Sequence, residues 1–225
     1  MIKVPKSSLQ FLESLRKNNN RVWFDEHKKE FKEEEEKLKL FYNKVLEDLN
    51  ESDTIEKMKI FRIYRDVRFS KDKTPYKTHR GVSFSRATES LRGGYFLRIA
   101  PGETMMAGGF FQPNTSDLLR IRKEFEVDAV EIREIVADDN FIKLFSELEG
   151  DELKSAPRGF DKNHPNIDLI RKKSFLVTRK FTDKEVLDIG FSEKIKESFL
   201  ALRPFFDYMS DVLTTDINGI SILKK

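Results

Sequence analysis

The residues with the clearest potential for chemistry lie in one basic segment, residues 57–80. It holds nine Lys and Arg residues against two carboxylates, Asp66 and Asp72, so its net charge is +7 while the rest of the chain sums to −4. Guanidinium groups form paired hydrogen bonds with phosphate, and lysine supplies a point charge. We therefore predict that this segment binds a phosphorylated small molecule or a nucleic acid, with tyrosines stacking or hydrogen bonding. The predicted ligand-binding residues are Arg62, Tyr64, Arg65, Arg68, Lys71, Lys73, Tyr76 and Lys77.

Two other roles for the segment stay open at the level of sequence. In the first, the protein is an enzyme that uses Asp66, or Asp161 with His164, as acid–base groups while arginines fix an anionic substrate. In the second, the arginines are structural and pair with Asp66, Asp72 and acidic residues of the second helix. A concave pocket would favour a small molecule or catalysis, an exposed basic stripe would favour nucleic acid, and internal ion pairs would favour structure.

A second cluster contains Asp161, His164 and Asp168 within eight residues. These side chains are metal ligands, an acid–base set or helix caps. We predict capping by Asn163 or His164, because Pro165 suits the first position of a helix and Asp168 then favours the first turn. The absence of cysteine excludes disulfides and thiolate metal sites. We predict no metal and no cofactor, since no phosphate-loop or dinucleotide signature is found.

The spacing of apolar residues predicts the elements that position these groups. Helices are expected over Ser7–Arg16 and Val22–Leu49. Three successive helices are expected between Ser116 and Gly150, and a last one from Ser192, with a kink or a new helix at Pro204. Strands are expected over Phe61–Phe69, Gly81–Arg86, Gly94–Ala100, Thr104–Gln112 and Ser174–Thr178, with a hairpin turn at Pro101–Glu103. Because no helix separates the first four strands, we predict an α+β fold. An antiparallel sheet of about four to six strands would be flanked by helices from both ends of one domain, residues 1–225.

Composition agrees with a folded protein that does not span a membrane. Charged residues make up 36% of the chain, but aromatic residues reach 12% with 20 Phe, which is enough for a core. No apolar run approaches the roughly 18 residues of a membrane span, and the N-terminus lacks the apolar core of a signal peptide. We predict a cytoplasmic protein without a membrane partner. Trp23 is expected to pack against the sheet, and Gly108-Gly109 to mark a bulge or a close backbone approach, perhaps to a ligand.

Several motifs together resemble the domain of unknown function 2461 family, over roughly residues 9–212. The motifs are Asn18–Arg21 with Trp23-Phe24, the run Phe61–Thr78, Gly93–Tyr95, Ala107–Gly109, Pro157–Asp161, Asn163–Pro165 and Lys173–Phe175. Val22 stands where the family usually has an acidic residue, and Thr178 where it usually has serine; neither position lies in the basic segment. The resemblance implies no reaction, because the family has no established activity.

Overall fold

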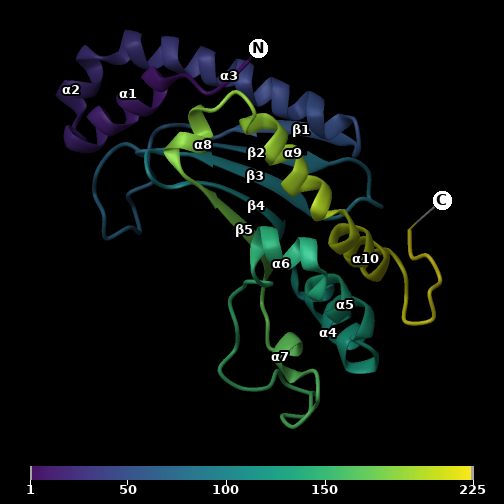
Figure 1. The fold of residues 1–225 in the computed structure, drawn as a ribbon. Helices are drawn as coiled ribbons and strands as arrows, with labels where there is room; N and C mark the ends of the chain where they lie inside the picture. Colours follow the sequence, from purple (N-terminus) through teal and green to yellow (C-terminus); the bar gives the residue numbers. More distant parts are fainter. Residues whose placement is uncertain (1, 224–225) are drawn as a thin grey trace. The chain divides into compact units, whose positions relative to one another are not determined.

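The structure is a computed structural model that describes residues 2–223. Its sheet contains five strands in the order β1-β2-β3-β4-β5, and neighbouring strands run antiparallel (Figure 1). The strands are β1 (Ile55–Ile60), β2 (Arg80–Arg86), β3 (Gly94–Ile99), β4 (Thr104–Phe110) and β5 (Phe175–Phe181). The predicted α+β class is therefore confirmed, and the turn at Pro101–Glu103 joins β3 to β4 as expected.

The helices fall into three groups along the chain. Before the sheet come α1 (Lys6–Lys17), α2 (Arg21–Glu26) and α3 (Lys28–Asn50). Between β4 and β5 come α4 (Thr115–Val127), α5 (Val130–Ala137), α6 (Asp139–Phe145) and the short α7 (Ile167–Ile170). After β5 come α8 (Asp183–Leu187), α9 (Phe191–Ala201) and α10 (Arg203–Thr214). Pro204 lies in the first turn of α10, so the new helix predicted at this proline is present. Within residues 2–223, none of these helices has both the length and the apolar character that crossing a bilayer requires.

The chain divides into two compact units, and the boundary crosses strands β2 to β5. The first unit contains residues 2–84, 96–106 and 180–197, and the second contains residues 85–95, 107–179 and 198–223. The basic segment lies wholly in the first unit, whereas Asp161, His164 and Asp168 lie in the second. The single domain expected from the sequence stays a prediction.

In the first unit, aromatic side chains connect the N-terminal helices to the basic segment. Helix α1 packs along α3, and Phe41 of α3 stacks on Phe191 with ring centroids 5.6 Å apart. A buried cluster joins Phe24 of α2 to Ile63 and Tyr76 of the basic segment. Phe24 and Tyr76 are stacked at 4.0 Å. This packing holds the basic segment against α1 and α2.

Residues 61–69 do not form the predicted strand. Strand β1 ends at Ile60, and beyond it one antiparallel bridge pairs Tyr64 with Tyr76. Main-chain hydrogen bonds from Arg65 N to the Pro75 carbonyl (2.9 Å) and from Lys77 N to the Ile63 carbonyl (2.8 Å) close an irregular hairpin. Pro75, opposite Arg65 in the returning half of the hairpin, has no N–H and cannot continue a ladder of strand hydrogen bonds. The alternation over residues 61–69 therefore marks an extended arm and not a sheet strand. We call residues 61–79 the basic arm.

The predicted helix over Val22–Leu49 is interrupted at His27. The backbone of His27 leaves helical geometry at φ −103° and ψ 12°, and a new helix starts at Lys28. The imidazole Nδ1 lies 2.8 Å from the Trp23 carbonyl, and the two rings stack at 4.0 Å. The backbone N–H of His27 also donates to the Trp23 carbonyl (3.1 Å), so both the backbone and the ring of His27 contact this oxygen where α2 ends. Trp23 contacts this histidine and Phe11 of α1 (5.8 Å), and it packs against the buried cluster that contains Phe24.

In the second unit, Gly109 permits a close approach between backbones. Its φ is +140°, and a Cβ placed there would lie 2.2 Å from the Phe175 carbonyl oxygen of β5. At the preceding position a Cβ on Gly108 would lie 2.3 Å from Leu202. The close approach predicted for this glycine pair is therefore present, and its partners are the protein's own strand and helix.

Candidate anion-binding site on the basic arm

Local hydrogen bonds fold the end of the basic arm into a defined loop. Asp66 accepts from the backbone N–H of Arg68 (3.2 Å), and Asp72 accepts from that of Thr74 (2.9 Å). The Ser70 hydroxyl accepts from the backbone of Asp72 (3.2 Å). Short polar side chains that bond the backbone two residues on are the usual way to stabilise such turns.

An asparagine of the N-terminal segment joins the arm to α2. The Asn19 side chain donates to the Tyr76 carbonyl (2.9 Å) and accepts from the Tyr76 N–H (3.1 Å). The next residue, Asn20, caps α2 through the backbone N–H of Trp23 (3.0 Å). The first residue of that helix, Arg21, is consequently placed beside the arm.

Between α2 and the arm lies an open hollow of about 440 Å³. It is lined by Arg21, Asp25, Tyr64, Arg65, Val67, Lys73, Pro75 and Tyr76. Four of the eight predicted ligand-binding residues are thus brought together: two tyrosines, one arginine and one lysine. Arg21 and Asp25 were missed because they are remote in sequence from the basic segment, although Arg21 ends the family-like Asn18–Arg21 motif.

The other four predicted residues lie outside this hollow. Arg62, Arg68 and Lys71 are exposed on the arm. Lys77 lines a smaller hollow of about 160 Å³ together with His79 and Phe61. The basic arm therefore presents cations over an area wider than a single pocket.

Three arginines of the basic segment have carboxylate partners within the protein. Arg65 pairs with Asp72 (2.7 Å), and Arg68 forms a two-point contact with Asp66 (3.0 and 2.7 Å). Arg80 pairs with a glutamate of α3. This arrangement supports the structural interpretation for these three side chains.

The remaining cations have no carboxylate partner among residues 2–223. Arg21, Arg62 and Lys71 form no ion pair within this range. Lys73 Nζ donates to the Val67 carbonyl (2.8 Å), and Lys77 Nζ donates to the Arg62 carbonyl (3.1 Å). Their charges are therefore left for solvent or for an anion.

Burial and neighbouring cations together shift the pKa values of two titrating groups of the arm. Burial and the charges of nearby arginines lower the pKa of Lys77 from its ordinary 10.5. Burial, then the charges of Arg98 and Lys77, lowers the pKa of His79 to about 4. Burial is the larger cause of both shifts, and the surrounding cations add to it.

The hollow also contains neutral and acidic groups that add selectivity. Burial and the charge of Asp25 raise the pKa of Tyr76, so its phenol stays protonated at neutral pH. Neither Asp25 nor the Tyr76 hydroxyl forms a hydrogen bond elsewhere in the described chain. A ligand bound here would meet cations, a phenol donor and one carboxylate acceptor.

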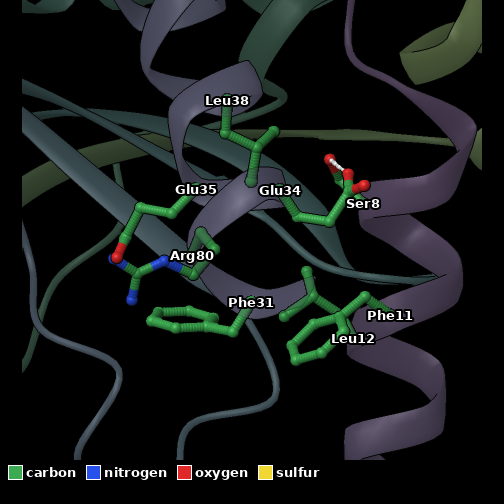
Figure 2. Close-up of a pocket in the computed structure, with 8 residues that line it drawn as sticks. All are labelled: Ser8, Phe11, Leu12, Phe31, Glu34, Glu35, Leu38 and Arg80. Carbon is green, nitrogen blue, oxygen red and sulfur yellow. Dashed lines mark hydrogen bonds and ion pairs between the residues drawn. The ribbon is translucent and has the colours of Figure 1, made fainter. Parts of the chain in front are cut away.

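Behind the arm, the Arg80 side chain is buried beside α3 (Figure 2). It turns toward Glu35, while Glu34 turns toward Ser8 of α1 and accepts its hydroxyl at 2.7 Å. Burial opposes ionisation of Glu34, but hydrogen bonds from Lys37 and the α1 serines outweigh it and lower its pKa. The cavity between these groups measures about 10 Å³, near the space of one water, so it is a packing gap and not a ligand site.

The side chains of the second predicted cluster take part in turn hydrogen bonds and an ion pair. Asp161 Oδ1 accepts from the Asn163 N–H (2.9 Å), and His164 Nδ1 accepts from the Asn166 N–H (3.1 Å), so both side chains stabilise turns. Asp168 lies in the first turn of α7 as predicted and pairs with Arg133 (2.7 Å). The cap itself is Asn166, which corrects the predicted cap at residue 163 or 164. Across residues 2–223, no three His, Asp or Glu side chains are grouped to hold a metal.

Comparison with known proteins identifies the family. The family model described as conserved hypothetical protein (DUF2461) matches residues 7–208. The chain belongs to this family. Comparison with the curated proteins and with the solved structures gives no match. The description of this family names no activity.

Proposed function

We propose that this DUF2461 protein binds a phosphate-bearing ligand through the basic arm, with the hollow beside α2 as the centre of the site. One observation carries the proposal: Arg21, Arg65 and Lys73 converge on the same open hollow from two separate segments. Solubility does not require cations from distant parts of the sequence to meet at one place. Their meeting suits the binding of an anion with several oxygen atoms.

The charge of the arm supports the same function. Arg21 and Lys73 have no carboxylate partner in the described chain. Burial first, and neighbouring cations second, lower the pKa values of Lys77 and His79. A bound dianion would neutralise repulsion that the empty protein retains. Binding should therefore stabilise the fold.

The paired arginines have a supporting role in this proposal. Arg65 lines the hollow, and its guanidinium Nη1 pairs with Asp72 at 2.7 Å. A guanidinium has five N–H donors, so a carboxylate on one side leaves donors for a ligand on another. The structural interpretation of these arginines and the binding proposal are therefore compatible.

Enzyme activity at Asp66 is less well supported. Hydrogen bonds from Arg68 lower the pKa of Asp66 to about 2, which makes the carboxylate a poor proton acceptor at neutral pH. Asp161 and His164 are engaged in turn hydrogen bonds within the other unit. Neither set has the free acid–base pair that the enzyme alternative requires.

The test is thermal unfolding of the whole chain in inorganic phosphate, sulfate and chloride at matched ionic strength. A ligand at about 100 times its dissociation constant adds about 2.7 kcal/mol of stability, so phosphate should raise the melting temperature and the effect should saturate. Sulfate and phosphate also stabilise proteins generally by exclusion from the surface. A variant is needed to separate the two effects.

The test variant is Arg21→Gln with Lys73→Gln, which removes two cations of the hollow and breaks no carboxylate pair. The matched control is Arg158→Gln with Lys162→Gln, which removes the same charge from exposed positions of the other unit. We expect the saturable part of the phosphate effect to disappear in the first variant and to persist in the control. Equal phosphate effects in both variants would refute the site.

A further inference from the structure

The most exposed large apolar side chain of the described residues lies at the end of the basic arm. Phe69 is 95% exposed. Its one ring contact is with the Arg68 guanidinium, 5.9 Å from the ring centroid. The protein therefore presents a free aromatic face to solvent.

The loop that carries Phe69 is held in place on both sides. Asp66 binds the backbone of Arg68 on one side, and the Ser70 hydroxyl accepts from the backbone of Asp72 on the other. Lys73 Nζ reaches across to the Val67 carbonyl (2.8 Å). Phe69 is presented by a folded loop, which lowers the entropy that a contact to its ring would cost.

A second accessible aromatic ring lies five residues earlier along the arm. Tyr64 is 47% exposed in the hollow, and its ring is 5.5 Å from that of Tyr76. Cations occur between and beside the two exposed rings: Arg65 and Arg68 lie between them in sequence, and Lys71 follows. Residues 61–79 carry six Lys and Arg against two Asp, a net charge of +4.

We propose that the phosphate-bearing ligand is a single-stranded nucleic acid, whose bases stack on Tyr64 and Phe69 while the cations of the arm contact its phosphates. This inference rests on the proposed anion-binding function and assigns its ligand class. Aromatic faces interleaved with cations are the usual platform for single strands, because every base has a face to stack and every nucleotide carries a charge.

The same features disfavour two other large anionic partners, a nucleic-acid duplex and a lipid bilayer. In a duplex the base faces are already stacked on one another. The arm has no helix, and its irregular hairpin with one bridge pair differs from the regular two-stranded ribbon that fills a major groove. An anionic bilayer could take up the Phe69 ring in its interface while the neighbouring cations contact the lipid headgroups. Tyr64 lies within a hollow, however, which a flexible strand can enter and a membrane surface cannot.

The experiment measures fluorescence anisotropy of labelled oligothymidylate of about 16 nucleotides with the whole chain over a series of salt concentrations. Affinity should fall as the salt concentration rises. The slope of the logarithm of the association constant against the logarithm of the salt concentration should be about −0.7 for each phosphate contacted. A duplex of equal length should bind more weakly. Lys71→Gln should reduce the slope by about 0.7. Binding without this salt dependence would overturn the proposal.

The diagnostic variant is Phe69→Ala. It should lower affinity about 5- to 150-fold and leave the salt slope unchanged, because stacking contributes about that factor per base and releases no counterions. Phe69→Trp should retain binding. The control is Phe111→Ala, which removes another exposed phenylalanine from the second unit. Oligothymidylate affinity that is the same in Phe69→Ala and in the wild type would overturn the stacking role.

Failure of this inference can be told apart from failure of the proposed function. Saturable stabilisation by inorganic phosphate without oligothymidylate binding would refute the single strand and keep the anion site. Absence of both effects would refute both. Binding to phosphatidylserine vesicles that is lost in Phe69→Ala, with no oligothymidylate binding, would overturn the inference in favour of a membrane surface.

Discussion

Replacing Glu35 with glutamine tests whether the buried Arg80 depends on a single carboxylate. Arg80 is the last residue of the basic segment, and its side chain is 4% exposed while that of Glu35 is 30% exposed. The guanidinium also lies over the Phe31 ring at 5.6 Å. Its Nη1 is buried and has no hydrogen-bond partner among the described residues. Glu35→Gln leaves the packing nearly unchanged and removes the charge that compensates Arg80.

The expected loss follows from the burial of the two partners. Removing one member of a fully buried ion pair costs about 3–5 kcal/mol, because the other charge is left without compensation. Solvent reaches Glu35, so we expect a smaller loss of about 2–3 kcal/mol in the free energy of unfolding. For a chain of this size that corresponds to a fall of about 5–10 °C in melting temperature.

Urea denaturation of Glu35→Gln and of the neighbouring Glu36→Gln measures this difference. Glu36 is 72% exposed at its side chain and lies 3.6 Å from Lys39, so its loss should stay within about 0.5 kcal/mol. A double variant with methionine at both Glu35 and Arg80 should recover much of the stability, since it contains no unpaired charge. If Glu35→Gln were as stable as Glu36→Gln, compensation of Arg80 by Glu35 would be refuted.

Two further predictions concern backbone space and pH. Gly109→Ala should lose about 2 kcal/mol or more, or fail to fold, because its φ of +140° strains alanine and the Cβ would meet the Phe175 carbonyl oxygen at 2.2 Å. Gly102 has a φ of +69° and open space around it, so Gly102→Ala should lose about 1 kcal/mol in the free energy of unfolding. If urea denaturation gave equal losses for Gly109→Ala and Gly102→Ala, the close approach at Gly109 would be refuted. Burial and neighbouring cations lower the pKa of His79 to about 4, so only the unfolded state takes up this proton as the pH falls below about 6.5. Stability should therefore fall between about pH 6.5 and pH 4, and His79→Gln should reduce that fall; coinciding pH profiles would contradict the assigned pKa.

The sequence alone determined the class of the fold and the location of the unusual charge. Strands β2, β3 and β4 follow alternation and turn residues that are local, and Pro204 marks the start of α10 because proline favours the first turn of a helix. The basic segment could be recognised because charge is a property of composition. These features depend on neighbours in the chain, so no tertiary information was needed.

The partners of the charged residues were decided only by the tertiary structure. Three of the nine cations in residues 57–80 are paired with carboxylates, and the hollow draws Arg21 and Asp25 from α2, far along the chain. Alternation over residues 61–69 predicts a sheet strand, because an extended arm has the same period as a strand, but these residues lie outside the sheet. Whether such a segment joins a sheet depends on which backbone lies beside it, and here that backbone is the arm's own returning half around Pro75.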